Sequence, residues 1–315
     1  MVKVIVLMST YNGQDYLEEQ IESILSQKGV DVKLYIRDDG SSDNTVQIAE
    51  KNEQVTVIKG NNIGVGPSFM TLLLDCPKAD YYAFADQDDI WDENKLISAV
   101  NLLKENKEKP TLYVGNQRSI DKEANFIENR FDSSFPKQTL LNVLFMNLYS
   151  GCTMVMNNLL KEQLCDSKKC PPLSFFNHRI HDAWIACVAL TVGIIIYDEN
   201  PHMSFRRHGN NQTDAEIVRN KKMNIRTNAR LLRSKLKRVI KGKSRKIRGV
   251  ELTAKYLLKG YGYSLTDEEK LVLTYAEKYR KMIKFRKKLL LGDIFKKYAP
   301  EKNTDLKLKV LLNIL

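Results

Sequence analysis

The sequence predicts an α/β fold, in which a sheet of mainly parallel strands carries helices on both faces. Through the first hundred residues, short apolar runs typical of strands alternate with segments whose apolar residues recur at helical spacing, as in βαβ units. The composition is that of a folded protein, because 43% of the 315 residues are hydrophobic and 28% are charged. A chain of this length can form one large domain, or a catalytic domain with an extension.

The elements of the first hundred residues have separate signals. The strands are short apolar runs, and the segment 14–27 places Leu17, Ile21 and Ile24 on one helical face. Ser and Asp residues at 41–44 are start signals for the helix that follows them. In chain order, alternating strands and helices are expected at residues 3–10, 14–27, 32–40, 41–52, 55–60, 66–76 and 81–89.

The rest of the chain is less regular. A strand is expected at 111–120, a helix leading through Gly151 into a strand over 140–157, and a buried helix from His181. Further helix is expected over 251–291, with a capping signal at Thr266 ahead of a run of acidic residues.

Neither a targeting segment nor a membrane span is evident. The apolar run at the N-terminus is too short for a signal peptide and is typical of a first strand. The longest apolar run, residues 183–197, is interrupted by Thr191 and Gly193 and is shorter than a membrane span. The five cysteines form no C-x-x-C pair, which argues against a disulfide framework or a zinc site and indicates a reducing cytosol.

The charge is distributed unevenly along the chain. Residues 1–200 hold 19 Lys and Arg and 28 Asp and Glu, a net charge of −9, whereas residues 201–315 hold 31 and 10, a net charge of +21. This asymmetry predicts two regions with different roles, a domain over residues 1–212 and a helical basic region over residues 213–315.

Polar residues follow each of the four expected strands of the N-terminal part. Because ligands bind outside the carboxyl ends of parallel strands, these clusters should converge on one rim of the sheet. The clusters are Ser9 to Asn12, Arg37 to Asp39, Asn61 with Asn62, and Asp86 to Asp89.

The segment DQDD at residues 86–89 places three carboxylates in four positions. One interpretation is a solvated loop that caps the following helix. The other is a cation site, because Mg²⁺ and Mn²⁺ prefer oxygen ligands and a bound cation would remove the repulsion among these carboxylates. The position of the loop, directly after a buried strand at the expected ligand rim, favours the cation site.

The segment RDDG at residues 37–40 also has two interpretations. An Asp-Gly turn with Ser caps accounts for Gly40 and the serines after it. It accounts less well for two adjacent carboxylates at a strand end. A carboxylate at a strand end can accept a hydrogen bond from the imide N–H of a uracil or thymine base. The ring of Tyr11, at the neighbouring strand end, could stack on the same base.

Together these motifs resemble the donor-binding half of family-2 glycosyltransferases with the GT-A fold. The resemblance rests on VIVLMSTYNGQDYLEEQIESILSQ, IRDDGSSDNT, NNIGVGPSF and FADQDDIW in this order, and it covers residues 1–100 almost continuously. It implies a GT-A, Rossmann-like mixed sheet with helices on both faces, nucleotide-sugar binding by residues 1–100 and an acceptor side over 101–212. The donor-binding residues that it implies are Ser9, Tyr11, Asp39, Asn62, Gly64, Ser68 and Asp86.

The same resemblance implies a metal site. Asp86 matches the first Asp of the family's D-x-D motif, which approaches the ribose. Asp88 matches the last Asp, which coordinates an Mg²⁺ or Mn²⁺ ion that bridges the diphosphate. His208 in RRHGNN matches a His beside the diphosphate or the metal. Asp89 and Asp92 then remain for local capping.

The acceptor side is implied by two later segments. Gly151 matches the family's acceptor-side glycine loop, and Asp182 in HDAW matches the carboxylate that deprotonates the acceptor hydroxyl. The family often has an acidic residue where this chain has His181. The alternative for Asp182 is a helix N-terminal acid favoured by the helix dipole.

The function implied is inverting, metal-dependent sugar transfer. HDAW and RRHGNN are similar to segments of bacterial rhamnosyltransferases of cell-wall and capsular polysaccharide synthesis. These imply a dTDP-rhamnose donor and a lipid-linked saccharide acceptor, at the inner face of the cell membrane in the cytoplasm. The Q-x-x-R-W motif of processive synthases is absent.

Three other functions are compatible with parts of the pattern. Another hexosyltransferase using a UDP-sugar would share the same motifs. A sugar-nucleotide pyrophosphorylase would normally show a Gly-rich, basic phosphate loop after the first strand, which MSTYNGQDY does not provide. A catalytically inactive GT-A scaffold protein would have no need of complete carboxylate motifs.

The basic region also has three interpretations. Residues 219–248 contain fourteen Lys and Arg and no Asp or Glu, and Leu231, Leu232 and Leu236 recur at helical spacing, so a basic amphipathic helix is expected. A solvated helix needs no function. A nucleic-acid binder would normally interleave aromatic residues, which are absent here. The third interpretation is a helix at a membrane surface, because an apolar stripe beside a basic face can bind anionic lipid. We expect this peripheral association with an anionic membrane surface, and no nucleic acid partner.

Overall fold

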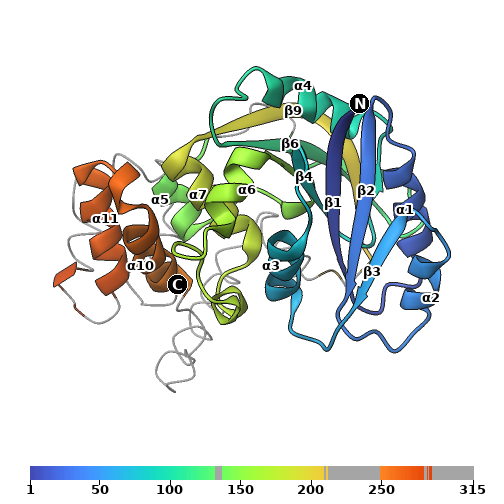
Figure 1. The fold of residues 1–315 in the computed structure, drawn as a ribbon, viewed down its shortest axis with the longest axis horizontal. Helices are drawn as coiled ribbons and strands as arrows, with labels where there is room; N and C mark the ends of the chain where they lie inside the picture. Colours follow the sequence, from blue (N-terminus) through green and yellow to red (C-terminus); the bar gives the residue numbers. More distant parts are fainter. Residues whose placement is uncertain (132–136, 209–210, 212–248, 280–281, 283, 286–315) are drawn as a thin grey trace, which may run out of the picture.

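The computed structural model describes residues 1–315 except 132–136, 209–210, 212–248, 280–281, 283 and 286–315 (Figure 1). The described residues form one sheet of nine strands with helices packed against it. The strand order is β3-β2-β1-β4-β8-β6-β9-β5, and β7 pairs with β6 at the side. The strands are β1 (Val2–Thr10), β2 (Val30–Asp38), β3 (Val55–Lys59), β4 (Tyr81–Ala85), β5 (Ile90–Trp91), β6 (Thr111–Ile120), β7 (Phe126–Asn129), β8 (Met154–Asn157) and β9 (Ile194–Arg206).

The sheet has a parallel and a mixed part. Strands β3, β2, β1 and β4 pair in parallel, as the alternation of strands and helices predicts. Strand β8 lies antiparallel between β4 and β6, β9 pairs in parallel with β6, and β5 closes the other edge antiparallel to β9. The predicted α/β fold with a mixed sheet is confirmed.

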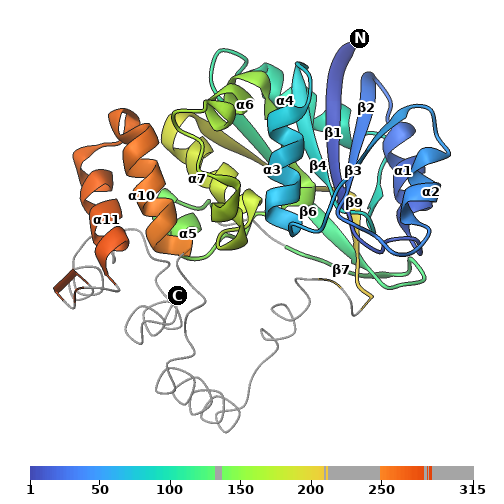
Figure 2. The ribbon, with the colours of Figure 1, turned by 60° about the horizontal axis from the view of Figure 1, so that its bottom comes forward.

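Helices cover both faces of the sheet, as Figure 2 shows. Successive side chains of β1 point to opposite faces of the sheet, so the protein has an apolar core on each face. Val4, Val6 and Met8 pack on one face with α1 and α4. Ile5 and Leu7 pack on the other face with α3, α6 and α7. The helices are α1 (Leu17–Leu25), α2 (Thr45–Glu50), α3 (Val65–Asp75), α4 (Lys95–Lys104), α5 (Leu140–Phe145), α6 (Asn158–Cys165), α7 (His181–Val192), α10 (Gly249–Tyr261) and α11 (Asp267–Lys278), with 3₁₀ turns η1 (Gly151–Thr153), η2 (Leu173–Asn177) and η4 (Gly262–Ser264).

The longest apolar run of the sequence belongs to two elements. Helix α7 ends at Val192, and β9 starts at Ile194, so Gly193 is the junction. A Cβ atom at Gly193 would lie 1.8 Å from the carbonyl oxygen of Pro110, so only glycine fits there. None of the helices among the described residues combines the length and the apolar character that a membrane crossing requires.

Two helices near the C-terminus pack against the sheet domain. Thr266 and Glu269 form the predicted capping box at the start of α11. The helix expected over 251–291 is interrupted by the 3₁₀ turn at Gly262. Leu257 of α10 and Leu273 of α11 belong to the same apolar core as α5 and α7. The basic segment 219–248 lies outside the described residues, and the division at residue 212 remains a prediction.

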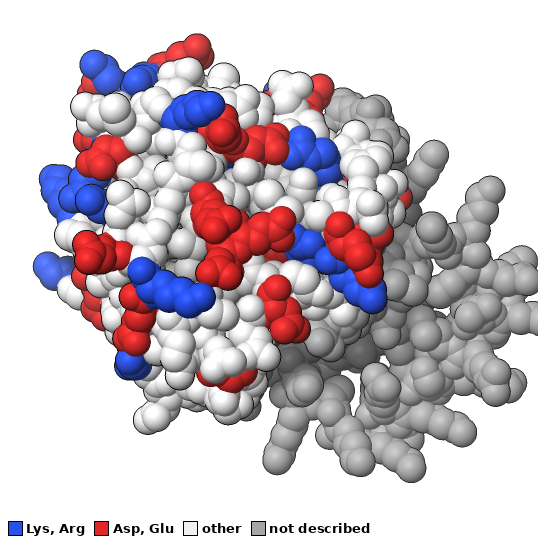
Figure 3. Space-filling model, turned by 90° about the vertical axis from the view of Figure 1, so that its right-hand side faces the viewer, with Lys and Arg blue, Asp and Glu red and all other residues white. Residues whose placement is uncertain are grey.

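The surface charge agrees with the composition of the N-terminal part. On the face that carries α1 and α2, a group of acidic side chains occupies the centre and basic side chains are scattered around it (Figure 3). This pattern fits the excess of Asp and Glu over Lys and Arg in residues 1–200.

Candidate active site

The carboxyl ends of the four parallel strands open into a cleft of about 580 Å³. The loops after β1, β2, β3 and β4 all contribute to it, as expected for the ligand rim of a parallel sheet. The loop before β8 and the start of α7 line it as well. Ten of the residues predicted from the sequence line this cleft: Ser9, Tyr11, Asp39, Asn62, Gly64, Asp86, Asp88, Gly151, Asp182 and His208.

Ser68 is the one predicted site residue that does not line the cleft. It is fully buried in the first turn of α3. Its Oγ lies 2.6 Å from the Oγ of Ser9 and accepts a hydrogen bond from Arg37 at 3.2 Å. Ser68 therefore holds the side chain of Ser9 by a hydrogen bond without lining the cleft itself.

The two carboxylates of the RDDG segment have different environments. Asp38 accepts hydrogen bonds from the backbone N–H groups of Gly40 at 3.1 Å and Ser41 at 2.9 Å, and from the hydroxyl of Thr10 at 3.2 Å. This is the turn and cap role that the sequence suggests for such residues. The glycine is required, because its φ is +86°.

Asp39 faces the cleft and also holds the loop after β3. Its carboxylate accepts the backbone N–H groups of Ile63 at 3.0 Å and Gly64 at 2.8 Å and forms a buried ion pair with Arg37. Arg37 also donates to the carbonyl oxygen of Asn61 at 3.1 Å. The sequence places Arg37 in the polar cluster at this strand end, but it does not reveal that the guanidinium pairs with Asp39 and the loop after β3.

Asp88 and His208 form a close pair inside the cleft. Nε2 of His208 lies 2.7 Å from Oδ2 of Asp88, although the two residues are 120 positions apart in the chain. The side-chain nitrogen of Asn211 lies 3.5 Å from the same oxygen, and the ring of Tyr16 packs on His208 with centroids 5.0 Å apart. A carboxylate oxygen and an imidazole nitrogen are both groups that can ligate a divalent metal ion. Asn211 and Tyr16 were not predicted from the sequence.

Asp86 lies beside Asp88 and shares its charge environment. Burial raises the pKa of Asp86 to about 7, and the negative charges of Asp88 and Asp182 add to the rise. A carboxylate in this position gains from a nearby cation, since a cation would favour its ionised form.

Asp89 and Asp92 do not cap the following helix, so that expectation is wrong. Helix α4 starts after Asn94 and has no side-chain cap. Asp89 is fully buried, and its carboxylate accepts the backbone N–H of Arg206 at 3.3 Å. Asp92 forms an ion pair with Arg118 instead. Both side chains turn toward strands that are distant in the sequence, which a local capping pattern cannot reveal.

Two carboxylates of the DQDD loop lie close to the buried thiol of Cys152. One ligand atom each of Asp86, Asp89 and Cys152 lies within 4.8 Å of the others. Lys95 packs its ammonium 3.5 Å from the centre of the Trp91 ring, and burial lowers its pKa to about 7. Burial also raises the pKa of the Cys152 thiol. Asp86 and Cys152 of this group line the same cleft as Asp88 and His208, whereas Asp89 does not.

Asp182 lies in the first turn of α7 and lines the cleft. Its carboxylate accepts the backbone N–H of Ala183. Burial raises the pKa of Asp182 to about 6, although that hydrogen bond and the charges of Arg179 and Arg130 oppose the rise. A carboxylate with this pKa is mostly ionised at pH 7 and remains basic enough to accept a proton.

His181 occupies the position where the family often has an acid. Its ring stacks on Phe69 with centroids 4.3 Å apart, and neither of its nitrogens has a hydrogen-bond partner in the described residues. Burial lowers the pKa of His181 to about 3, so the ring is neutral at pH 7. A Cβ atom at position 151 would lie 2.9 Å from its Nε2, which explains the glycine in the predicted acceptor loop.

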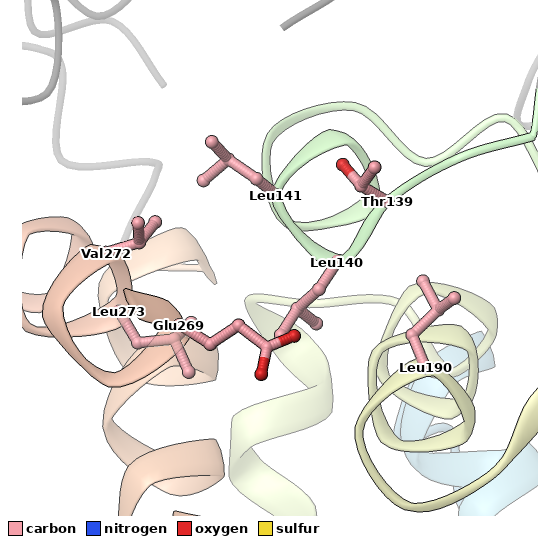
Figure 4. Close-up of a pocket in the computed structure, with 7 residues that line it drawn as sticks. All are labelled: Thr139, Leu140, Leu141, Leu190, Glu269, Val272 and Leu273. Carbon is pink, nitrogen blue, oxygen red and sulfur yellow. The ribbon is translucent and has the colours of Figure 1, made fainter. Parts of the chain in front are cut away.

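A second cavity, of about 240 Å³, lies between α5, α7 and α11 (Figure 4). Its walls are mainly apolar, and its one carboxylate, Glu269, is engaged in the capping box with Thr266. The cavity therefore lacks a free acid or base among the described residues. Its lining residues are Thr139, Leu140, Leu141, Leu190, Glu269, Val272 and Leu273.

Comparison with known proteins agrees with the site. Residues 5–163 match the family described as Glycosyl transferase family 2. The chain belongs to this family. The protein is therefore a glycosyltransferase, as the resemblance of its N-terminal motifs predicted, and the matched segment contains the seven residues predicted to bind the donor.

Relatives of this glycosyltransferase act in sugar transfer as well. It is 33% identical to the dTDP-rhamnosyl transferase RfbG of Shigella flexneri over 227 residues, which are 67% of this chain and 74% of RfbG. It is 29% identical over 155 residues to WfgD of Escherichia coli, a UDP-Glc:alpha-D-GlcNAc-diphosphoundecaprenol beta-1,3-glucosyltransferase. That match covers 49% of this chain and 59% of WfgD.

A solved structure confirms the fold of this glycosyltransferase. Residues 1–349 of S. aureus TarS, crystallised with UDP-GlcNAc, superpose with a TM-score of 0.59. The match covers 98% of this chain and 79% of the TarS chain, at 16% sequence identity. The GT-A fold predicted from the sequence is thus confirmed.

Replacing His181 by Gln should change how stability depends on pH. Folding lowers the pKa of His181 from 6.5 to about 3, so between these values the unfolded chain binds a proton that the folded protein does not. The proton stabilises the unfolded state, so the contribution of His181 to the free energy of unfolding falls by up to about 1.4 kcal/mol per pH unit on acidification. Gln cannot titrate and lacks this loss.

Urea denaturation of both proteins between pH 7.5 and 4.5 measures the effect. We expect the difference in the free energy of unfolding to move in favour of H181Q as the pH falls below about 6.5. The comparison cancels the carboxylates Asp86 and Asp182, whose raised pKa values act in the opposite direction. The matched control for the loss of a histidine is H178Q, at an exposed position. A constant difference for H181Q would contradict the assignment of a neutral, buried ring.

Proposed function

We propose that this glycosyltransferase moves a sugar from a nucleotide diphosphate to an acceptor hydroxyl with inversion at the anomeric carbon. The observation that carries the proposal is the arrangement of one cleft. The Asp88–His208 pair and the carboxylate of Asp182, whose pKa is about 6, line the same cleft. Inverting transfer requires one group for the leaving diphosphate and one base for the incoming hydroxyl.

The donor side binds the nucleotide through the strand ends. Tyr11 is half exposed at the cleft, where its ring is available for stacking on a base. Asp39 lies beside it and has lone pairs for the imide N–H of uracil or thymine, in addition to the backbone groups of the loop that it holds. Asn62 and Gly64 contact the donor from that loop, and Asp86 approaches the ribose.

The diphosphate binds next to Asp88 and His208. These residues would hold a divalent ion, Mg²⁺ or Mn²⁺, which when bound would supply positive charge for the departing nucleotide diphosphate. Asp88 contributes an oxygen and His208 a nitrogen, and Asn211 donates toward the same Asp88 oxygen.

Asp182 is the general base. It accepts the proton of the acceptor hydroxyl as that oxygen attacks the anomeric carbon. The backbone N–H of Ala183 orients the carboxylate. Gly151 provides room on the acceptor side, since a side chain there would displace the ring of His181.

We propose L-rhamnose from dTDP-rhamnose as the transferred sugar and a lipid-linked saccharide as the acceptor, in cell-wall or capsular polysaccharide synthesis. The donor is supported by the similarity to RfbG, and the acceptor by the diphosphoundecaprenol in the name of WfgD. The name of WfgD also favours the alternative of a UDP-sugar hexosyltransferase. An inactive GT-A scaffold is disfavoured by the complete set of carboxylates in the cleft.

We further propose that the basic region binds the cytoplasmic membrane surface as a peripheral contact. The proposal rests on the sequence, because residues 213–248 lie outside the described residues. The charge of +21 over residues 201–315 would attract anionic lipid, at about 1 kcal/mol per Lys or Arg near the surface.

A panel of donors tests the reaction. With Mn²⁺ present, we expect dTDP-rhamnose to be turned over at least about tenfold faster than UDP-glucose, UDP-GlcNAc or GDP-mannose, with kcat/KM as the measure. Release of the free nucleotide diphosphate and mass spectrometry of the acceptor product give two independent readouts. A clear preference for a UDP-sugar would select the alternative donor. Absence of turnover with any donor, under conditions where donor binding is detected, would point to the inactive scaffold.

Asp182→Asn should abolish the base without removing the donor site. We expect kcat to fall by about 10²- to 10⁴-fold, while the donor dissociation constant changes less than about threefold. A base must be deprotonated, so wild-type kcat/KM should rise about tenfold per pH unit below about pH 6 and level off above it. Transfer by the Asn variant at near wild-type rates, or a wild-type profile flat from pH 5 to 8, would remove Asp182 from this role.

Vesicle sedimentation tests the membrane proposal. Full-length protein should pellet with phosphatidylglycerol vesicles at low salt and be released at about 0.5 M NaCl, because screening weakens the attraction. Vesicles of phosphatidylcholine alone are the control and should retain much less protein. Equal retention on both vesicle types, or none on the anionic ones, would contradict electrostatic membrane binding.

A further inference from the structure

Arg206, the last residue of β9, is a charged side chain buried next to the cleft without lining it. Only 2% of the side chain is exposed. A buried guanidinium is costly unless its N–H groups are paired, and here each nitrogen has a partner. Nε donates to the carbonyl oxygen of Asp88 at 3.0 Å, one terminal nitrogen to the carbonyl oxygen of Lys122 at 3.0 Å, and the other to the carboxylate of Glu19 at 2.5 Å.

These partners come from separate parts of the chain. Glu19 belongs to α1, Asp88 to the loop after β4, and Lys122 to the turn between β6 and β7. The backbone N–H of Arg206 donates to the buried carboxylate of Asp89 at 3.3 Å. Side chain and backbone of one residue therefore hold two consecutive positions of the DQDD loop.

His208, the partner of Asp88 in the cleft, lies just after the same strand end. His208 follows two residues after Arg206, and the side chain of Asn211 donates to the carbonyl oxygen of Arg206 at 2.7 Å. Tyr16 packs against both residues, with its ring 4.8 Å from the Arg206 guanidinium carbon and 5.0 Å from the His208 ring. The position of His208 relative to Asp88 thus depends on contacts that converge on Arg206.

We propose that Arg206 is a positioning residue that fixes Asp88 and His208 at the separation needed to bind one divalent cation together. The inference rests on the proposed metal site. Groups that orient metal ligands from behind commonly contribute about 10- to 100-fold in metal affinity. A lysine would keep the charge of Arg206 but could not reach three acceptors in different directions with one ammonium group.

Titration with Mn²⁺ alone, in the absence of donor, tests the proposal. Isothermal calorimetry should give a dissociation constant for Arg206→Lys at least about tenfold weaker than for the wild type. At saturating Mn²⁺ and donor, kcat should stay within about threefold of the wild-type value, because the ligands themselves are present. The matched control is Arg207→Lys, the next residue, whose guanidinium pairs with the partly exposed Glu128 outside the cleft. Its Mn²⁺ affinity should equal that of the wild type.

A second variant keeps the test decisive if Arg206→Lys does not fold. Glu19 is half exposed on α1, so Glu19→Gln should leave the fold intact while weakening one anchor of Arg206. We expect a two- to fivefold loss of Mn²⁺ affinity, compared with none for Glu18→Gln, whose partner is the surface residue Lys51.

The outcomes separate this proposal from the proposed function. Weaker Mn²⁺ binding in Arg206→Lys or Glu19→Gln, with unchanged controls, supports the positioning role. Wild-type affinity in the folded variants overturns it and leaves the metal site intact. If the wild-type protein itself binds no Mn²⁺, the metal site fails first, and the positioning role fails with it.

Discussion

The parallel register of β1 with β2 and β4 is the constraint on which the site depends. Thr10 pairs with Asp38, and Met8 pairs with Ala85, so three strands end at nearly the same level. The residues that follow them, Tyr11, Asp39 and Asp86, therefore enter one cleft although they are far apart in the chain. A shift of one residue in either pairing would turn every side chain of the shifted strand to the opposite face and separate the residues of the rim.

This convergence has an electrostatic cost. Asp86 lies near the charges of Asp88 and Asp182, and burial raises the pKa of Asp86 to about 7. Lys95 does not fully offset the repulsion among these carboxylates. It is buried against Trp91, and burial lowers its pKa to about 7, so its positive charge is only partly present at pH 7. The cleft is thus poised to gain stability from an added cation. The same low-dielectric setting strengthens the attraction of such an ion for a diphosphate.

Much of this site was predictable from the sequence, since the donor-side residues follow strands whose patterns are clear. Asp88 and His208 were each predicted as metal ligands from the sequence, but their 2.7 Å contact is visible only in the structure. The contacts of Arg206 and Arg37 could not be predicted. Strand β9 shifts register against β6 twice before Arg206, so a period of two does not tell which way its side chain points. Asp89 was assigned to a cap for a similar reason, because a local pattern does not show a partner 117 residues away.

A crystal structure of the protein with Mn²⁺ and an unhydrolysable dTDP-rhamnose analogue would show directly where the metal ion and the donor bind. We expect an anomalous Mn²⁺ peak within bonding distance of Asp88, His208 and the diphosphate, with the face of the anomeric carbon opposite the diphosphate turned toward Asp182. A peak among Asp86, Asp89 and Cys152 instead, or a sugar whose anomeric carbon faces away from Asp182, would contradict this expectation.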